Sequence, residues 1–228
     1  KKISMLTAYD ASMARLLSGS EVDIFLVGDS LGMVMLGYES TVPVTMDEML
    51  HHAKAVRRGA PETFILGDMP YGSYHTGTAD AVRNGIRFMK EAGCDAVKLE
   101  GGLAMCDVVK ALVEAGVPVM GHIGLTPQTA SQQGGYKVQG KGLDDARRML
   151  AEGKALEEAG AFGLLVECIP DTLAEVLTES LEIPTVGIGA GVHCDGQVLV
   201  THDLLGMFDK FTPKFVKKYA DLSPVITQ

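Results

Sequence analysis

The sequence predicts a single (β/α)8 TIM barrel over residues 1–228, on the basis of three observations. Eight short apolar runs alternate with amphipathic stretches, a pattern typical of parallel strands joined by right-handed helical crossovers. Eight such units fit a chain of 228 residues. Several runs also end on an acidic residue, as expected where the strand ends carry the chemistry of a barrel. A doubly wound open sheet is the alternative, but no G-x-G-x-x-G follows the first run.

The predicted strands are short, nearly continuous apolar runs, which is typical of strands buried on both faces. The second run, I-F-L-V, leads directly into Gly28 and Asp29, so that a carboxylate follows a buried strand. The eight predicted strands are Ile3–Ala8, Ile24–Val27, Phe64–Asp68, Ala96–Glu100, Val117–Gly121, Gly163–Glu167, Thr185–Ile188 and Val198–Thr201.

Capping signals and apolar stripes locate the predicted helices. Asp10 can cap the first helix, and Thr45 with Glu48 forms a capping box for a later one. Thr78 can cap the next helix, and a further helix covers Asp144–Ala159. The apolar stripes of these four helices contain Met13 and Leu17; Met49, Leu50, Ala53 and Val56; Val82, Ile86 and Met89; and Ala146, Met149, Leu150, Gly153 and Leu156.

The tripeptide Glu-Ala-Gly recurs before three of the predicted strands, at residues 91–93, 114–116 and 158–160. A glycine in the left-handed conformation ends a helix and turns the chain back toward the sheet. The repeat therefore predicts three helix-to-strand junctions of similar geometry.

Composition and charge exclude several classes of partner. The formal net charge of −9 argues against nucleic acid or an anionic membrane as the main partner. No apolar stretch approaches the roughly 20 residues needed to cross a bilayer. Cys94, Cys106, Cys168 and Cys194 show no C-x-x-C spacing, so we expect reduced thiols in a cytoplasmic protein. The chain begins with Lys1-Lys2 and has neither an initiator methionine nor a signal peptide, so we expect some N-terminal sequence to be missing.

Acidic residues at the ends of predicted strands indicate a metal site. Asp29, Asp68, Glu100 and Glu167 each follow an apolar run, and strand periodicity places Lys98 on the same face as Glu100. The first three acids outweigh the single positive charge of Lys98. A divalent cation would balance them, and oxygen ligands favour Mg²⁺. The competing interpretation is a network of ordinary ion pairs, although one lysine cannot pair with three acids.

Three further features each allow two interpretations. His122 is either a packed core residue or a substrate contact, and its position at a strand end favours the contact. The segment Gly134–Gly140 is either a mobile loop that covers the site or an ordinary surface loop. The G-I-G-A-G sequence at residues 187–191 is either a phosphate cradle or a turn that needs positive φ angles.

A set of short motifs, in order along the chain, points to a known family. They are L-T-A-Y-D at 6–10, V-G-D-S-L-G at 27–32, R-R-G-A-P at 57–61, V-K-L-E-G-G at 97–102, G-H-I-G-L-T-P-Q at 121–128, the segment 134–140, V-E-C-I-P at 166–170 and the segment 184–191. Together they resemble the ketopantoate hydroxymethyltransferase family from Leu6 to Val200. Tyr71 stands where the family often has Phe, and the family usually carries further sequence at both ends.

The resemblance implies a Mg²⁺-dependent barrel enzyme of pantothenate biosynthesis that forms a ring-like homo-oligomer, a decamer. The family transfers a hydroxymethyl group from 5,10-methylenetetrahydrofolate to 3-methyl-2-oxobutanoate, giving 2-dehydropantoate (ketopantoate). Carried over by motif, the implied metal residues are Asp29, Asp68 and Glu100, the substrate-binding residues are Asp29, Ser30, Asp68, Lys98 and His122, and the acid/base is Glu167.

The charges around the predicted site suit the formation of an enolate. A 2-oxo acid can chelate Mg²⁺, the metal stabilises the enolate formed when the C3 proton leaves, and Lys98 adds a second positive charge. Burial and neighbouring acids should raise the pKa of Glu167, which suits a group that accepts and donates protons. Two other functions remain as alternatives: a lyase or mutase related to isocitrate lyase, for which a K-K-C-G-H type motif is missing, and a non-catalytic metabolite sensor.

Overall fold

Eight parallel strands pair in sequence order and close into a barrel in the computed structural model, which describes residues 1–228. The strands are β1 (Ile3–Thr7), β2 (Ile24–Val27), β3 (Phe64–Asp68), β4 (Ala96–Glu100), β5 (Val119–Gly124), β6 (Gly163–Glu167), β7 (Thr185–Ile188) and β8 (Gly196–Leu199). Strand β1 pairs with both β2 and β8, so no edge is left open. The barrel is confirmed, and the open sheet is excluded.

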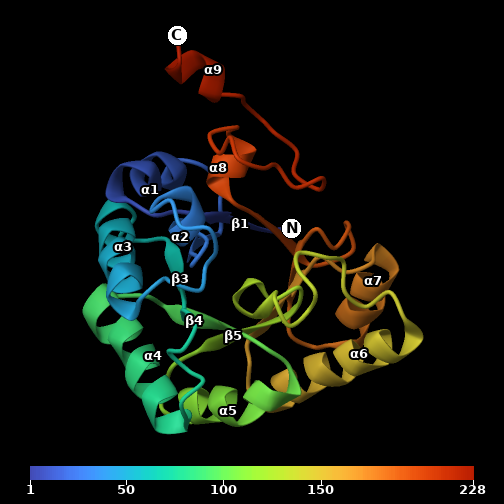
Figure 1. Ribbon diagram of the computed structural model, residues 1–228. Coiled ribbons are helices and arrows are strands. Elements are labelled where there is room, and N and C mark those ends of the chain that lie inside the picture. Colours follow the sequence, from blue (N-terminus) through green and yellow to red (C-terminus); the bar gives the residue numbers. More distant parts are fainter.

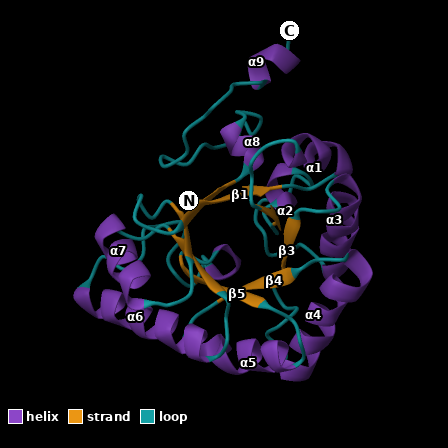
Figure 2. Ribbon diagram, turned by 180° about the vertical axis from the view of Figure 1, so that it is seen from behind, coloured by secondary structure: helices purple, strands orange, loops and turns teal.

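Helices surround the barrel on its outside, as Figures 1 and 2 show. They are α1 (Ala11–Ser18), α2 (Leu31–Val34), α3 (Met46–Gly59), α4 (Thr78–Ala92), α5 (Cys106–Glu114), α6 (Leu143–Glu158), α7 (Asp171–Ser180) and α8 (Thr201–Leu204), with 3-10 turns η1 (Leu103–Met105) and η2 (Pro127–Thr129). The last helix, α9 (Ser223–Ile226), lies away from the barrel (Figure 1). None of these helices combines the length and apolar character that a membrane span requires.

The strands are buried on both faces, which explains their continuous apolar runs. Side chains on the outer faces, such as Phe25 and Leu99, belong to the large core between the barrel and the helices. The inner faces contribute a separate cluster of eight buried residues, one from each strand, which we call the barrel floor. The floor consists of Met5, Leu26, Leu66, Ala96, Met120, Leu165, Val186 and Val198.

Two of the predicted helix caps are confirmed, and one is wrong. The Asp10 side chain accepts hydrogen bonds from the N–H groups of Ser12 and Met13. Thr45 and Glu48 form the reciprocal capping box at the start of α3. Thr78, by contrast, is the first residue of α4, and the cap position is occupied by Gly77, which has no side chain to contribute.

The predicted apolar stripe of α4 is displaced by about one residue. The residues that α4 buries are Ala81, Gly85, Phe88 and Ala92, whereas Ile86 is 40% exposed. A Cβ atom added at Gly85 would come within 2.5 Å of a Leu112 methyl group on α5. Small residues therefore bring α4 close to its neighbours, and a pattern based on large apolar side chains misses that face.

The predicted bounds of two strands are shifted. Strand β5 begins at Val119 rather than Val117, because Val117 still closes α5 through Leu112 O and Pro118 has no N–H group to donate. It continues through His122 to Gly124. Strand β8 runs from Gly196 to Leu199. Thr201 is the first residue of α8, and its hydroxyl and N–H groups donate to Thr7.

The three Glu-Ala-Gly tripeptides behave as predicted. Their glycines, Gly93, Gly116 and Gly160, have φ angles of 68°, 83° and 98°. Each therefore adopts a left-handed backbone conformation just after a helix, from which the chain enters β4, β5 or β6.

The last residues of the chain leave the barrel after α8 and end in α9, which projects away from the strands (Figure 1). On the way, the Phe215 ring packs against the turn that follows β7, where a Cβ added at Gly189 would lie 2.7 Å from it. A Cβ added at Gly191, in the same turn, would lie 2.5 Å from Asp171 Cβ. Gly189 and Gly191 have φ angles of 62° and 80°, as the turn interpretation predicts.

Candidate active site

A cavity of about 130 Å³ opens at the C-terminal ends of the strands, and all seven residues of the predicted site line it. Strand periodicity alone places four of them inside the barrel: Asp68, Lys98 and Glu167 lie one layer above the floor, and Glu100 lies one layer further out. Its lining consists of Thr7, Leu26, Gly28, Asp29, Ser30, Met33, Thr41, Asp68, Lys98, Glu100, His122, Pro127, Tyr136, Leu165, Glu167, Ile188, Val198 and Val200.

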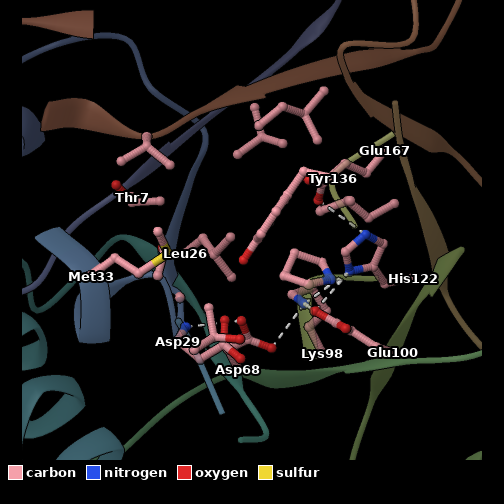
Figure 3. Close-up of a pocket in the computed structure, with 18 residues that line it drawn as sticks. Thr7, Leu26, Asp29, Met33, Asp68, Lys98, Glu100, His122, Tyr136 and Glu167 are labelled. Atoms are coloured by element: carbon pink, nitrogen blue, oxygen red, sulfur yellow. Dashed lines mark hydrogen bonds and ion pairs between the residues drawn. The ribbon is translucent and has the colours of Figure 1, made fainter. Parts of the chain in front are cut away.

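The cavity has one charged wall and one apolar wall. Asp29, Asp68, Lys98, Glu100 and His122 lie together at the ends of β2 to β5, as Figure 3 shows. The apolar wall comes from Leu165 on β6, Ile188 on β7, Val198 on β8 and Val200, which lies between β8 and α8. The cavity therefore suits a small molecule with an anionic end and a hydrocarbon end.

Lys98 is the one cation in the lining and lies at the centre of the charged wall. Its Nζ atom is 2.9 Å from Asp68 Oδ1, 3.8 Å from Glu100 Oε1 and 3.1 Å from His122 Nδ1. Burial disfavours the charged ammonium, but Asp68, Glu100 and Asp29 together raise the Lys98 pKa above its usual value. Lys98 is therefore protonated at neutral pH.

The ammonium of Lys98 determines the tautomer of His122. An ammonium group can only donate, so Nδ1 of His122 accepts and Nε2 carries the proton. Burial, together with Lys98, lowers the pKa of His122 and keeps the ring neutral. Nε2 lies 3.3 Å from Glu167 Oε2, without hydrogen-bond geometry. His122 thus connects the charged wall to Glu167.

Three carboxyl groups of the cavity, those of Asp29, Glu100 and Glu167, have raised pKa values and hold their protons unusually strongly. Burial raises the pKa of Asp29 well above its usual value, with Asp68 and Glu100 adding to the effect. Burial also raises the pKa of Glu100 and of Glu167, each to about 8, although Lys98 opposes both shifts. Burial is therefore the main reason why these three groups hold their protons, and the neighbouring acids add to it.

Asp29 and Asp68 keep oxygen atoms that suit a hard cation. The N–H group of Asp29 donates to Asp68 Oδ2, while Asp68 Oδ1 faces Lys98 without a hydrogen bond. Asp29 Oδ2 is held by Gln128 Nε2. No group of three or more His, Cys, Asp or Glu side chains is arranged to hold a metal by itself. Such a site fits Mg²⁺, which takes one or two carboxylates and completes its shell with water and substrate.

Supporting contacts that the sequence does not reveal hold several of these residues. The Tyr9 hydroxyl lies 2.8 Å from the Ser30 hydroxyl, and both belong to motifs whose individual contacts were not predicted. Gln128 and Tyr74 form a second buried pair at 2.5 Å, next to Asp29 and Glu100. These partners are distant in the sequence from the residues that they hold, so no local pattern could identify them.

The loop Gly134–Gly140 contributes Tyr136, whose side chain extends into the cavity (Figure 3). Tyr136 is 57% exposed, and burial together with the Glu167 charge raises its pKa. The N–H group of Gln139 donates to Cys168 O and ties the far end of the loop to β6. The position of Tyr136 favours a loop that covers the site over an ordinary surface loop.

The backbone is strained directly after Glu167. Cys168 has a φ angle of 48°, and it is the only residue other than glycine with a positive φ. A left-handed conformation costs a residue with a side chain roughly 1–3 kcal/mol and persists only where surrounding contacts impose it. Here the N–H group of Cys168 donates to Ile188 O, and Leu125 N donates to Glu167 O. These bonds fix the direction from which Glu167 enters the cavity.

Comparison with known sequences decides the family. The sequence profile described as ketopantoate hydroxymethyltransferase matches residues 1–228. The chain belongs to the ketopantoate hydroxymethyltransferase family. It is 66% identical to the 3-methyl-2-oxobutanoate hydroxymethyltransferase of Desulfotalea psychrophila, over 100% of this chain and 82% of that protein. It is 61% identical to the enzyme of the same name from Heliobacterium modesticaldum, over 99% and 82% of the two chains.

Solved structures confirm the barrel. The phosphoenolpyruvate phosphomutase of Streptomyces platensis subsp. rosaceus superposes with a TM-score of 0.68 at 17% identity, over 90% of this chain and 78% of that one. Phosphonopyruvate hydrolase in complex with oxalate and Mg²⁺ gives a TM-score of 0.66 at 13% identity, over 89% and 76%. Identities this low establish the shared fold alone.

Membership of the ketopantoate hydroxymethyltransferase family confirms the resemblance seen in the motifs. The chain is a hydroxymethyltransferase of the pantothenate pathway, so the sensor and the lyase or mutase are excluded as its function. Its mutase-like neighbours share the barrel and not the activity.

Proposed function

We propose that this chain transfers a hydroxymethyl group from 5,10-methylenetetrahydrofolate to 3-methyl-2-oxobutanoate through a Mg²⁺-stabilised enolate, giving 2-dehydropantoate. The observation that carries the proposal is the cavity itself, where an excess of carboxylates surrounds one lysine and faces an apolar wall. The family supplies the overall reaction, and the arrangement of side chains supports the order of events within it.

The two walls of the cavity orient the keto acid. Its carboxylate and keto oxygen belong beside Lys98 and the metal residues, because only that wall carries positive charge. Its isopropyl group then lies toward Leu165, Ile188 and Val198, where burial of methyl groups is favourable. In this orientation the C3–H bond lies between the two walls, on the side from which Glu167 enters.

Asp29 and Asp68 are the proposed direct ligands of Mg²⁺, with Glu100 acting through water. Glu100 is less available, because its Oε2 atom accepts from Gln128 N and its Oε1 atom faces Lys98 and His122. When bound, the metal would supply positive charge for the oxygen atoms of the keto acid and its enolate. Phosphonopyruvate hydrolase, with the same fold, binds oxalate and Mg²⁺, which is consistent with this assignment.

Glu167 is the proposed base for the C3 proton. A pKa of about 8 allows the carboxylate both to accept this proton and to return one later in the cycle. Lys98 keeps its positive charge beside the enolate oxygen. The neutral ring of His122 lies between Lys98 and Glu167. The enolate carbon then forms a bond to the one-carbon unit of the folate, and water supplies the hydroxyl oxygen. The two bonds between that carbon and the folate nitrogens break, the nitrogens take up the C3 proton and one proton of the water, and tetrahydrofolate leaves.

The assembly and the compartment are also part of the proposal. We propose a homo-oligomer, a decamer, on the basis of the family resemblance. Exposed apolar residues of the C-terminal segment, Phe211, Tyr219 and Ile226, are available for contacts between copies. All four cysteines are free, which supports a reducing, cytoplasmic location.

Proton NMR of 3-methyl-2-oxobutanoate in D₂O tests the central step. We expect the C3–H signal to disappear when enzyme and Mg²⁺ are both present, without any folate, because enolisation precedes transfer. Enzyme with a chelator is the control and should leave the signal in place. Persistence of the C3–H signal with enzyme and Mg²⁺, in a preparation that completes turnover once the folate is added, would overturn the enolate as a free-standing step.

A further inference from the structure

Gln128 occupies an unusual place among the acids of the charged wall. It lies in η2, after β5, and its side chain is buried, with 3% of the residue exposed. Its Nε2 atom donates to Asp29 Oδ2 at 2.8 Å and to Met69 O at 2.9 Å. Its backbone N–H donates to Glu100 Oε2 at 3.0 Å. One residue thus holds the chain segments at the ends of β2, β3 and β4.

Tyr74 determines which way the amide of Gln128 faces. The Tyr74 hydroxyl accepts from the N–H of Glu100 at 3.1 Å, so its own proton is free to be donated to Gln128 Oε1, 2.5 Å away. Because Oε1 is held in this way, the NH₂ group must face Asp29. A rotated amide would place its oxygen atom against two acceptors, Asp29 Oδ2 and Met69 O, and would leave Gln128 Oε1 without the Tyr74 proton.

Neutral Gln128 supplies hydrogen-bond donors to the carboxylates of Asp29 and Glu100 without neutralising their charge, whereas a basic residue would neutralise it. Asp29 and Glu100 repel each other in a buried place, and each needs hydrogen-bond donors to keep its orientation. A lysine or arginine at this position would supply the donors but would also neutralise charge that a cation needs. The amide holds Asp29 Oδ2 without reducing the charge of the carboxylate, and the other carboxylate oxygen stays free for a ligand.

We propose that Gln128 is a positioning residue that pre-orients Asp29 and Glu100 for Mg²⁺, with Tyr74 setting the direction of its amide. The inference rests on the proposed function, since it assumes that these carboxylates serve a metal. It predicts that loss of the amide weakens the binding of Mg²⁺ more than it harms the folded protein.

Gln133 provides a matched control in the same loop. Its Oε1 atom accepts from Thr126 N, and its Nε2 atom donates to Gly124 O, so it also makes two buried or half-buried hydrogen bonds through its amide. It touches none of the acids. Substitution of Gln133 therefore tests what general loosening of this loop does, without any change beside Asp29.

The experiment is a calorimetric titration of Mg²⁺ into the metal-free enzyme, its Gln128→Met variant and its Gln133→Met variant, each shown to be folded by circular dichroism. Gln128→Met should raise the dissociation constant of Mg²⁺ by about 10–100-fold, the range typical of partners that orient metal ligands. Gln133→Met should leave it close to the parent value. At saturating Mg²⁺ the kcat of Gln128→Met should recover substantially, because the bound metal then orders Asp29 itself.

A Mg²⁺ affinity unchanged in Gln128→Met, or lowered equally in both variants, would overturn the inference. A parent enzyme that binds no Mg²⁺ would instead overturn the metal in the proposed function. Tyr74→Phe carries the test if Gln128→Met does not fold. It should weaken Mg²⁺ binding to a smaller extent, because Gln128 Oε1 then loses its donor and the side chain is held less firmly. An unchanged affinity counts against the inference. In a double variant Tyr74→Phe should add nothing to Gln128→Met, because Tyr74 acts through Gln128.

Discussion

The floor and the mouth of the barrel interior are built from the same strands and differ in kind. Leu66 in the floor and Asp68 at the mouth are two residues apart on β3, and both point inward. Floor residues are apolar and come from all eight strands, whereas the charged residues of the mouth come from the ends of β2 to β6. The residues that stabilise the barrel and the residues that carry its chemistry therefore lie in adjacent layers of side chains.

The mouth keeps its charges at the expense of stability. Buried carboxyl groups with raised pKa values indicate that their ionisation is unfavourable in the folded protein, while the floor gains free energy from each buried apolar side chain. Substitutions in the two layers should consequently have opposite effects. Those at the mouth should remove activity and spare the fold. Those at floor residues that do not line the cavity, such as Leu66, should do the reverse.

The largest effect is expected from Asp68→Ala, at the mouth. Loss of this carboxylate should abolish Mg²⁺-dependent activity, because a proposed metal ligand is gone. The fold should persist, since removing one acid from a site with excess negative charge relieves repulsion. Steady-state rates across a Mg²⁺ series, together with thermal unfolding, measure both. A variant that responds to Mg²⁺ like the parent would show that Asp68 is no ligand.

Glu167→Gln sharpens the comparison within the mouth itself. The variant should still bind Mg²⁺ and the keto acid, because its shape and most of its hydrogen bonding survive. Turnover should fall by roughly 10²–10⁴-fold, as is typical when an acid/base group is lost. Binding calorimetry and rates on one preparation separate the two outcomes. Near-normal turnover would remove Glu167 from the mechanism, and lost Mg²⁺ binding would make it a metal ligand.

Leu66→Ala tests the floor. Leu66 is fully buried, so truncation should destabilise the protein by roughly 2–5 kcal/mol through lost burial and the cavity left behind. The kcat of the folded protein should stay close to that of the parent, because the layer above is untouched. Urea unfolding and rates at low temperature measure the two quantities. A large loss of kcat with little change in stability would contradict the separation of the layers.

The most gradual effect is the change in the stability of the metal-free protein with pH. Glu167 has an ordinary pKa of 4.5 and a folded pKa of about 8, so between these values the unfolded chain releases a proton that the folded chain keeps. Stability must then fall as pH rises through this window, by at most about 1.4 kcal/mol per pH unit for one group.

Glu167→Gln cannot titrate, so its stability should decline less with pH than that of the parent. Urea unfolding of both proteins in a chelator, at pH values between about 5 and about 8, measures the difference between the two slopes. Parallel curves would show that Glu167 does not hold its proton in the folded protein.

Most of the barrel could be predicted from the sequence, because strand periodicity and helix capping are local properties. Six of the eight predicted strands agree with the structure to within one residue, and the acids at their ends all reach one cavity. The exceptions have local causes as well. Strand β5 begins after Pro118, because proline has no N–H group for the strand ladder. The packed face of α4 contains Gly85, which has no side chain and so does not appear in a pattern of apolar residues.

The sequence alone thus determined the barrel, the ends of six of its eight strands and the charged residues that line the cavity, because each follows from the spacing of side chains along a regular element. Only the tertiary structure decided which partners hold those residues: Tyr9 for Ser30, Lys98 for the tautomer of His122, and Gln128 for Asp29. Asp29 and Gln128 are 99 residues apart in the chain. Contacts over such distances depend on how the closed barrel brings strand ends together, which no local pattern records.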